Sequence, residues 1–257
     1  MRPTLSIKPV RTQGDTHLYS VFFDAQHLTE TDAPTADALV ADALSVLDES
    51  DSWDTKLVKD GATIRRRKVV DGLPWFCRVS QHAQGDLPFD LLWDKLGVQR
   101  FPSQKQYLTD VTRVNLLEAG SKNRTVWSAY HAPSSLMSPR IFTVLLETRL
   151  REYPPQARAG IAIEIPVDVS AQASFAEMEE RGVRAYAVTI EYIKEIEDGS
   201  KVEWRVITCR DYDGRLPPSV WLRQMPDRLV EVCANSLWVL ATHNSRCPPA
   251  IRTTMMR

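Results

Sequence analysis

Between residues 53 and 209 the sequence consists largely of strand patterns separated by turn signals, and a long helical pattern follows them. Asp60-Gly61 and Asp71-Gly72 are hairpin signals, because glycine tolerates the positive φ that tight turns require. These turns bracket residues 63–70, and residues 75–80 follow as a further strand pattern. The pattern predicts a three-stranded meander, and so many successive strands favour an antiparallel sheet.

The second half of the chain also has strand patterns. Residues 161–167 alternate isoleucine or valine with Ala162, Glu164 and Pro166, which predicts a half-buried strand. We expect two further antiparallel pairs, one across a polar turn around Gly120 and one across residues 197–200. Their strands are predicted at 107–116, 124–130, 183–193 and 202–209.

Two helices are predicted in the first half. Residues 32–35 lead into a helix whose apolar side chains recur at helical spacing through Leu47. Residues 88–96 predict a short helix that Gly97 ends. Both helices have one apolar side, so we expect each to pack against the sheet.

Two more helices are predicted further along the chain. Residues 138–140 indicate the start of a short helix through Leu146. Pro226 suits the first turn of a long C-terminal helix through about Thr242, because its missing N–H costs nothing there. The order of elements predicts an α+β fold, in which a curved antiparallel sheet wraps on the terminal helix and encloses an internal cavity. This is a helix-grip arrangement.

The domain organisation follows from the absence of a linker-like stretch. We expect one domain over residues 1–257, with a core at about 36–243 and a peripheral N-terminal segment and 244–257 tail. Two separate domains are the weaker alternative.

Composition argues against several classes of partner and location. The formal net charge of -1 provides no general field for nucleic acid or an anionic membrane. The basic run at 65–68 lies in a strand pattern, so its side chains alternate between faces. No secretory signal or membrane-spanning apolar run is visible, and the cysteines at 77, 209, 233 and 247 are widely spaced. These features favour a cytoplasmic protein without nucleic-acid or integral membrane association, and they leave its oligomeric state open.

Four segments carry a resemblance to a known family. They are Trp75–His82, Leu136–Phe142, Tyr192–Glu195 with Gly199 and Val202–Trp204, and Asp211–Pro217. In this order they resemble a fungal START-like domain family of unknown function, although Tyr212 and Arg215 depart from its pattern. The resemblance covers roughly residues 39–243 and implies the START and Bet v 1 type of fold with an internal cavity. It implies no single activity, because that superfamily includes lipid carriers, hormone receptors and cofactor-free cyclases and aldolases.

The sequence lacks phosphate-binding, nucleophile-elbow and zinc-protease motifs, so we expect no cofactor and no metal. The candidate catalytic residues are Arg78, His82 and Glu147. Arg78 is expected to orient an enolate or carboxylate, while His82 or a nearby glutamate moves a proton. The alternatives are a structural ion pair or surface position for Arg78, a strand-end histidine and a solvated helix-end Glu147. A buried Arg78 would need a carboxylate partner.

Ten further side chains are candidates for binding the ligand, since aromatic residues line apolar cavities and Tyr and Trp keep a polar group. Trp221 and Met225 are expected to form a lid just before the terminal helix. Arg140 has the alternative of a local capping role, and each aromatic residue has the alternative of a core position. The full set is Phe76, Ser80, Tyr107, Trp127, Tyr130, Arg140, Tyr186, Trp204, Trp221 and Met225.

These predictions favour a protein that binds an apolar small molecule, resembling a polyketide, terpenoid or alkaloid. Our leading interpretation adds a cofactor-independent cyclisation or isomerisation in secondary metabolism, to which positioning of the substrate alone contributes strongly. The alternative is a non-catalytic lipid or sterol carrier, which needs the same cavity but no polar constellation. A third possibility is a protein-interaction module without a cavity. The sequence leaves open which sheet face lines the cavity.

Overall fold

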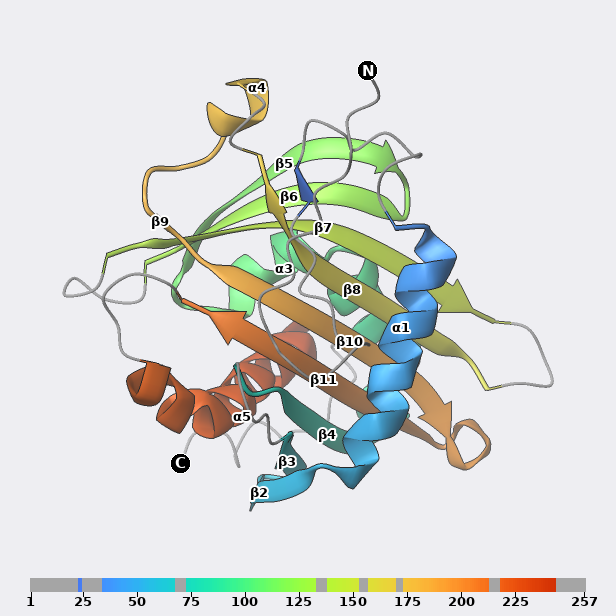
Figure 1. The fold of residues 1–257 in the computed structure, drawn as a ribbon. Helices are drawn as coiled ribbons and strands as arrows, with labels where there is room; N and C mark the ends of the chain where they lie inside the picture. The colour runs from blue at the N-terminus through green and yellow to red at the C-terminus, as the bar shows by residue number, and fades with distance from the viewer. Residues whose placement is uncertain are drawn as a thin grey trace.

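The computed structural model describes residues 23–24, 34–67, 73–132, 138–152, 157–169, 173–212 and 218–243. These residues form an 11-stranded sheet whose main path is β2-β3-β4-β11-β10-β8-β7-β6-β5 (Figure 1). Neighbours along this path are antiparallel, whereas β1 and β9 pair in parallel with β8 and β7. The strand bounds are β1 Phe23–Asp24, β2 Asp54–Lys59, β3 Ala62–Arg66, β4 Phe76–Ala83, β5 Val111–Ser121, β6 Arg124–His131, β7 Arg140–Arg151, β8 Ala159–Asp168, β9 Val183–Arg184, β10 Tyr186–Ile196 and β11 Lys201–Asp211.

The helical elements lie on both sides of this curved sheet. Figure 1 shows α1 crossing the near face of β8, β10 and β11, with α3 behind the sheet. No helix within the described ranges combines the length and apolar character needed to cross a bilayer. The helical bounds are α1 Ala36–Glu49, η2 Ser50–Ser52, α2 Phe89–Trp93, the π-helical η3 Asp94–Val98, α3 Arg100–Tyr107, α4 Ala173–Ala176, η4 Glu197–Gly199 and α5 Pro218–His243.

The predicted fold class is confirmed, and the turn chemistry explains the local registers. Asp60 and Gly61 both have positive φ, 51° and 72°, so the first Asp-Gly pair makes the tight turn between β2 and β3. The hairpin of β10 and β11 turns through residues 197–199, which also have positive φ. The second Asp-Gly pair, Asp71-Gly72, lies outside the described residues.

The predicted helix at 138–146 is wrong, because this segment belongs to strand β7. Residues 140–148 are all buried, so the strand shows no alternation of apolar and polar residues. A strand covered on both faces has a continuous apolar pattern, and such a run is easily mistaken for a helix.

Helix boundaries differ from prediction in two further places. Gly97 does not end the helical segment, which continues through η3 into α3, so Tyr107 ends a helix instead of starting a strand. Helix α5 begins at Pro218, and Pro226 lies inside it instead of in its first turn. Trp221 and Met225 therefore lie on the terminal helix, not before it.

The two faces of the sheet form separate apolar clusters. On one face, called here the α1 side, Leu39 and Leu47 of α1 pack with residues such as Ile163 and Ile190. On the other, called here the α5 side, α2, α3 and α5 cover three smaller clusters. Because side chains alternate along a strand, neighbouring residues of β4 or β8 point to opposite sides.

Candidate functional site

Strand β4 presents Phe76, Arg78, Ser80 and His82 on the α5 side. Their pairing with β11 places Arg78 opposite Val206 and Ser80 opposite Trp204. The structure therefore brings together five of the predicted site residues: Phe76, Arg78, Ser80, His82 and Trp204.

Arg78 is buried, with only 2% of its surface exposed. Its Nη2 donates to Ser80 Oγ at 2.7 Å, and the guanidinium carbon lies 4.6 Å from the centre of the Trp204 ring. Its Nε and Nη1 atoms are buried and have no hydrogen-bond partner in the described part of the chain. The expectation that a buried Arg78 is paired with a carboxylate is therefore wrong for these residues, although Glu191 lies near enough to act on it electrostatically.

His82 continues this row of hydrogen bonds, with Nε2 2.7 Å from Ser80 Oγ. Burial, helped by the nearby Arg78 charge, lowers the pKa of His82 to about 4. His82 is therefore neutral at pH 7. Because Arg78 donates to Ser80, we infer that Ser80 donates its own proton to His82 Nε2.

A buried ion cluster lies next to this row and is contributed by three elements. Arg100 of α3 donates from Nε to Glu164 Oε1 of β8 at 2.5 Å and from Nη1 to Glu191 Oε2 of β10. Trp204 Nε1 donates to the other Glu191 oxygen at 2.8 Å. Burial alone would lower the pKa of Arg100, but the two carboxylates raise it. Both oxygens of Glu191 are thus occupied by Arg100 and Trp204.

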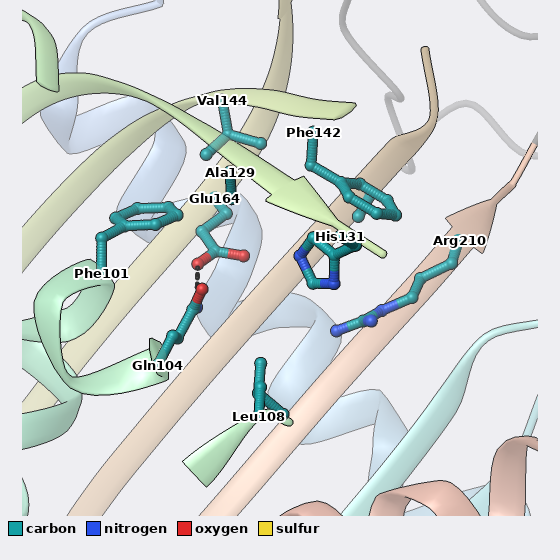
Figure 2. Close-up of a pocket in the computed structure, with 10 residues that line it drawn as sticks. Phe101, Gln104, Leu108, Ala129, His131, Phe142, Val144, Glu164 and Arg210 are labelled. Atoms are coloured by element: carbon teal, nitrogen blue, oxygen red, sulfur yellow. Dashed lines mark hydrogen bonds between the residues drawn. The ribbon is translucent and has the colours of Figure 1, made fainter. Parts of the chain in front are cut away.

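A pocket of about 360 Å³, counting space open to solvent, lies beside this cluster. Figure 2 shows Glu164 and Gln104 meeting at one side of the pocket, with His131 and Arg210 across from them. Apolar side chains supply the rest of the wall. The lining residues are Phe101, Gln104, Leu108, Ala129, His131, Phe142, Val144, Glu164, Ala187 and Arg210.

Within the described residues, this pocket occupies much less space than the predicted internal cavity. The space that a water-sized molecule can occupy in this pocket is about 30 Å³, far below the roughly 300–1,000 Å³ of small-molecule sites. The sheet face next to it is filled by Arg100 and its two carboxylates. Among the described residues, no group of three or more His, Cys, Asp or Glu side chains is placed to hold a metal ion.

The polar wall of the pocket is organised by local contacts. His131 Nδ1 lies 3.3 Å from Asp110 Oδ2. Although burial acts to raise it, the hydrogen bond with His131 brings the pKa of Asp110 below its usual value. Arg210 Nε donates to Thr208 Oγ1 at 3.2 Å. The wall therefore offers both donors and acceptors to a ligand.

Glu147 does not join the other two candidate catalytic residues. It lies on the α1 side, opposite Arg124 of β6. The distance from Arg124 Nη1 to Glu147 Oε2 is 3.6 Å. Burial raises the pKa of Glu147, but the sheet separates it from Arg78 and His82. The grouping of these three residues in one site is therefore wrong, because the segment expected to be a helix ending before Glu147 is a strand that continues through it.

The remaining predicted ligand-binding residues are distributed over both sides. Trp127 lies on the α5 side and stacks on Phe101, with ring centres 5.1 Å apart. Tyr130 and Tyr186 have the opposite parity on β6 and β10, so both point to the α1 side. Arg140 donates to the backbone carbonyls of Tyr212 and Ser138, in agreement with its alternative local role.

Three predicted residues lie on helices of the α5 side. Tyr107 is buried at the end of α3, close enough to Arg100 and Glu191 for their charges to act on its pKa. Trp221 and Met225 are buried on α5 and pack with Phe76 of β4. This arrangement places α5 over the strand that carries Arg78.

The central ion cluster is not predicted by any local sequence pattern. Glu164 was assigned to the polar face of a half-buried strand, but β8 is covered on both faces. Arg100 lies in α3. The sequence of this helix is largely polar, contains Pro102 and shows no clear helical spacing of apolar residues. The available signal was Glu191, a lone carboxylate within the otherwise uncharged run 187–193.

The chain has the helix-grip fold, and solved structures of START-type domains share it. Human StAR-related lipid transfer protein 5 has a TM-score of 0.64 at 15% identity, over 81% of this chain and 95% of that one. Human STARD10 has a TM-score of 0.61 at 15% identity, over 77% and 79%. The lipid transfer and protein localization domain of human StarD13 has a TM-score of 0.53 at 16% identity, over 80% and 96%.

The family profile described as "Protein of unknown function (DUF3074)" matches residues 75–237. This match covers more than half of the chain, so the protein belongs to that family. No curated protein sequence matches the chain significantly.

Proposed function

We propose that this protein binds one apolar small molecule on the α5 side of its sheet, in the pocket beside α3. The observation that carries the proposal is the pocket wall. It combines Phe101, Phe142 and Val144 with a few convergent polar groups, which is typical of small-molecule sites. The names of the human structural neighbours, which describe lipid transfer, favour the same class of ligand. We further propose that the chain forms a single domain and that the protein acts in the cytoplasm.

Native mass spectrometry of protein purified from its own host tests this proposal. We expect a bound molecule of defined mass that is released on denaturation. A matched pair of variants then tests the location. Ala129→Leu adds bulk to the pocket wall and should reduce binding at least tenfold, whereas Ala119→Leu adds the same bulk at an exposed position of β5 and should not. Equal binding by both variants would place the ligand elsewhere.

A second candidate function is a cofactor-free cyclisation or isomerisation of a polyketide-, terpenoid- or alkaloid-like substrate in secondary metabolism. The row Arg78–Ser80–His82 favours it. A neutral His82 can accept a proton as a base, and the buried guanidinium of Arg78 can stabilise an oxyanion. Lipid or sterol carriage without chemistry is its alternative and uses the same pocket.

Comparison of binding with turnover separates these two functions. His82→Gln keeps a hydrogen-bond acceptor for Ser80 but removes the base. A catalyst should lose turnover of the bound molecule at least a hundredfold with its affinity unchanged, and Glu147→Gln should not slow it. If the wild-type protein returns its natural ligand chemically unchanged, the catalytic proposal is rejected and carriage remains.

A further inference from the structure

The buried guanidinium of Arg78 has donors without acceptors among the residues that the structure describes, and this feature specifies the chemistry of the ligand. Arginine remains charged at any physiological pH. Two of its three nitrogens nevertheless lack a hydrogen-bond partner among the described residues, although the residue is only 2% exposed. Burying a charged group without its hydrogen bonds is unfavourable, so the ligand-free protein retains a destabilising group.

No neighbouring side chain within the described residues supplies the missing acceptor. Ser80 accepts from the third nitrogen, Nη2, and is also within hydrogen-bond distance of His82. Glu191 uses one oxygen for Trp204 and the other for Arg100. Cys233 lies close by on α5, but burial raises the pKa of its thiol to about 12, so it carries no negative charge at pH 7.

The surroundings of Arg78 match a singly charged group on an apolar body. Arg78 lies beside Ile64 on β3 and over the ring of Trp204, between the two apolar clusters that include Cys233 and Met225 of α5. Arg78 and Arg100 together balance Glu164 and Glu191, so a bound carboxylate adds one negative charge here and a phosphate monoester close to two. An apolar environment favours the group that brings the smaller charge.

We propose that Arg78 is the receptor for the carboxylate of an apolar monocarboxylic acid. This inference rests on the proposed function and deepens it by naming the ligand class. The body of the acid lies toward the pocket beside α3. Arg210 of that pocket is four residues along β11 from Val206, the partner of Arg78, which corresponds to roughly 13 Å. Between them the sheet presents the small residues Thr189 and Thr208.

Access to Arg78 requires displacement of α5, and this helix has a weak point. Pro226 lies inside α5 and has no N–H, so the helical hydrogen bond that this residue would donate is missing. The interruption lies next to Met225 and one turn from Leu229, two of the residues that cover β4. A local bend of α5 there opens the apolar cover without unfolding the sheet.

Decanoate and methyl decanoate test the proposal, because they differ chiefly in the negative charge. We expect wild-type full-length protein to bind decanoate at least tenfold more tightly than the ester, as measured by calorimetric titration. Arg78→Met should reduce the affinity for decanoate to that for the ester, and it should leave the affinity for the ester unchanged. Arg113→Met, the same change at an exposed arginine, should alter neither affinity.

The possible outcomes separate this inference from the proposed function. If both probes bind the wild type equally, or if Arg78→Met keeps the preference for decanoate, the carboxylate receptor is rejected and apolar binding stands. If neither probe binds and the protein from its own host carries no ligand, the proposed function fails and the inference fails with it. Arg78→Met should raise the melting temperature of the ligand-free protein, so loss of folding does not complicate the comparison. A lowered melting temperature would instead indicate that Arg78 is paired and would overturn the inference.

Discussion

Two buried arginines on the same side of the sheet illustrate opposite uses of one side chain. Arg100 donates to Glu164 and Glu191 and forms a closed ion cluster, whereas Arg78 retains two nitrogens without acceptors in the described residues. Removing one member of a buried ion cluster leaves the others uncompensated and is strongly destabilising, whereas a buried charge whose donors lack acceptors weakens the fold. Positions that weaken the fold in this way are often those required for binding.

Substitution of the two arginines is expected to change stability in opposite directions. Arg100→Met leaves two carboxylates buried without their cation and should lower the free energy of unfolding by about 3–5 kcal/mol. Arg78→Met removes unsatisfied donors and should raise it by about 1–3 kcal/mol. Urea denaturation of the ligand-free proteins at pH 7 measures both values. A loss of stability in both variants would contradict this view of Arg78.

The pKa of His82 predicts an acid-dependent loss of stability. The unfolded histidine gains a proton near pH 6.5, whereas burial holds the folded pKa at about 4, so the unfolded state binds more protons between these values. Stability should therefore fall as the pH decreases from 7 to 4.5. We expect wild-type protein to lose about 2 kcal/mol more than His82→Gln over this interval. Denaturation curves of both proteins at the two pH values check the difference, and identical losses would contradict it.

At the scale of elements, side-chain periodicity identifies which residues of a strand share a face, but a continuous apolar run does not separate a buried strand from a helix. The two-residue spacing of Arg78, Ser80 and His82 puts them on one side of β4. In β7 the apolar run was misread as a helix, because helices and strands on both sides bury it. That error moved Glu147 into a pocket from which the sheet separates it.

Helix α5 provides the next prediction, because Pro226 interrupts the helix that covers Arg78. Pro226→Ala restores the missing N–H and should stiffen the helix. We expect decanoate to dissociate at least threefold more slowly from this variant in stopped-flow displacement. Gln224→Ala, an exposed substitution in the same helix, serves as the control and should leave the rate unchanged. Equal dissociation rates in all three proteins would show that α5 does not control access.

At the scale of the whole molecule, the sheet separates a structural side from a binding side. On the α1 side, Arg205 of β11 donates to Leu47 O and Ser50 Oγ at 3.0 Å each, and this joins the end of α1 to the sheet. On the α5 side, the pocket wall has polar groups with capacity for a ligand, and two nitrogens of Arg78 have no hydrogen-bond partner in the described part of the chain. A ligand bound there connects α3, α5 and the sheet.

Ligand binding is therefore expected to stabilise the whole fold. A molecule that binds only the folded state adds about 2.7 kcal/mol to the free energy of unfolding at a hundred times its Kd. Decanoate should produce this increase in the wild type, and the increase should disappear at the same concentration in Ala129→Leu. Chemical denaturation with and without decanoate provides the measurement. Stability independent of decanoate would contradict binding to the native state.

The sequence by itself determined the local features of this protein. The Asp60-Gly61 turn, the α1 helix and the shared face of Arg78, Ser80 and His82 follow from backbone preference and side-chain periodicity, which act over a few residues. Only the tertiary structure decided which charges meet. Arg100 contacts carboxylates 64 and 91 residues further along the chain, and no local pattern encodes such pairing. The lack of acceptors for Arg78 among the described residues is likewise evident only from the tertiary structure, because hydrogen bonding of a buried group depends on the packing around it.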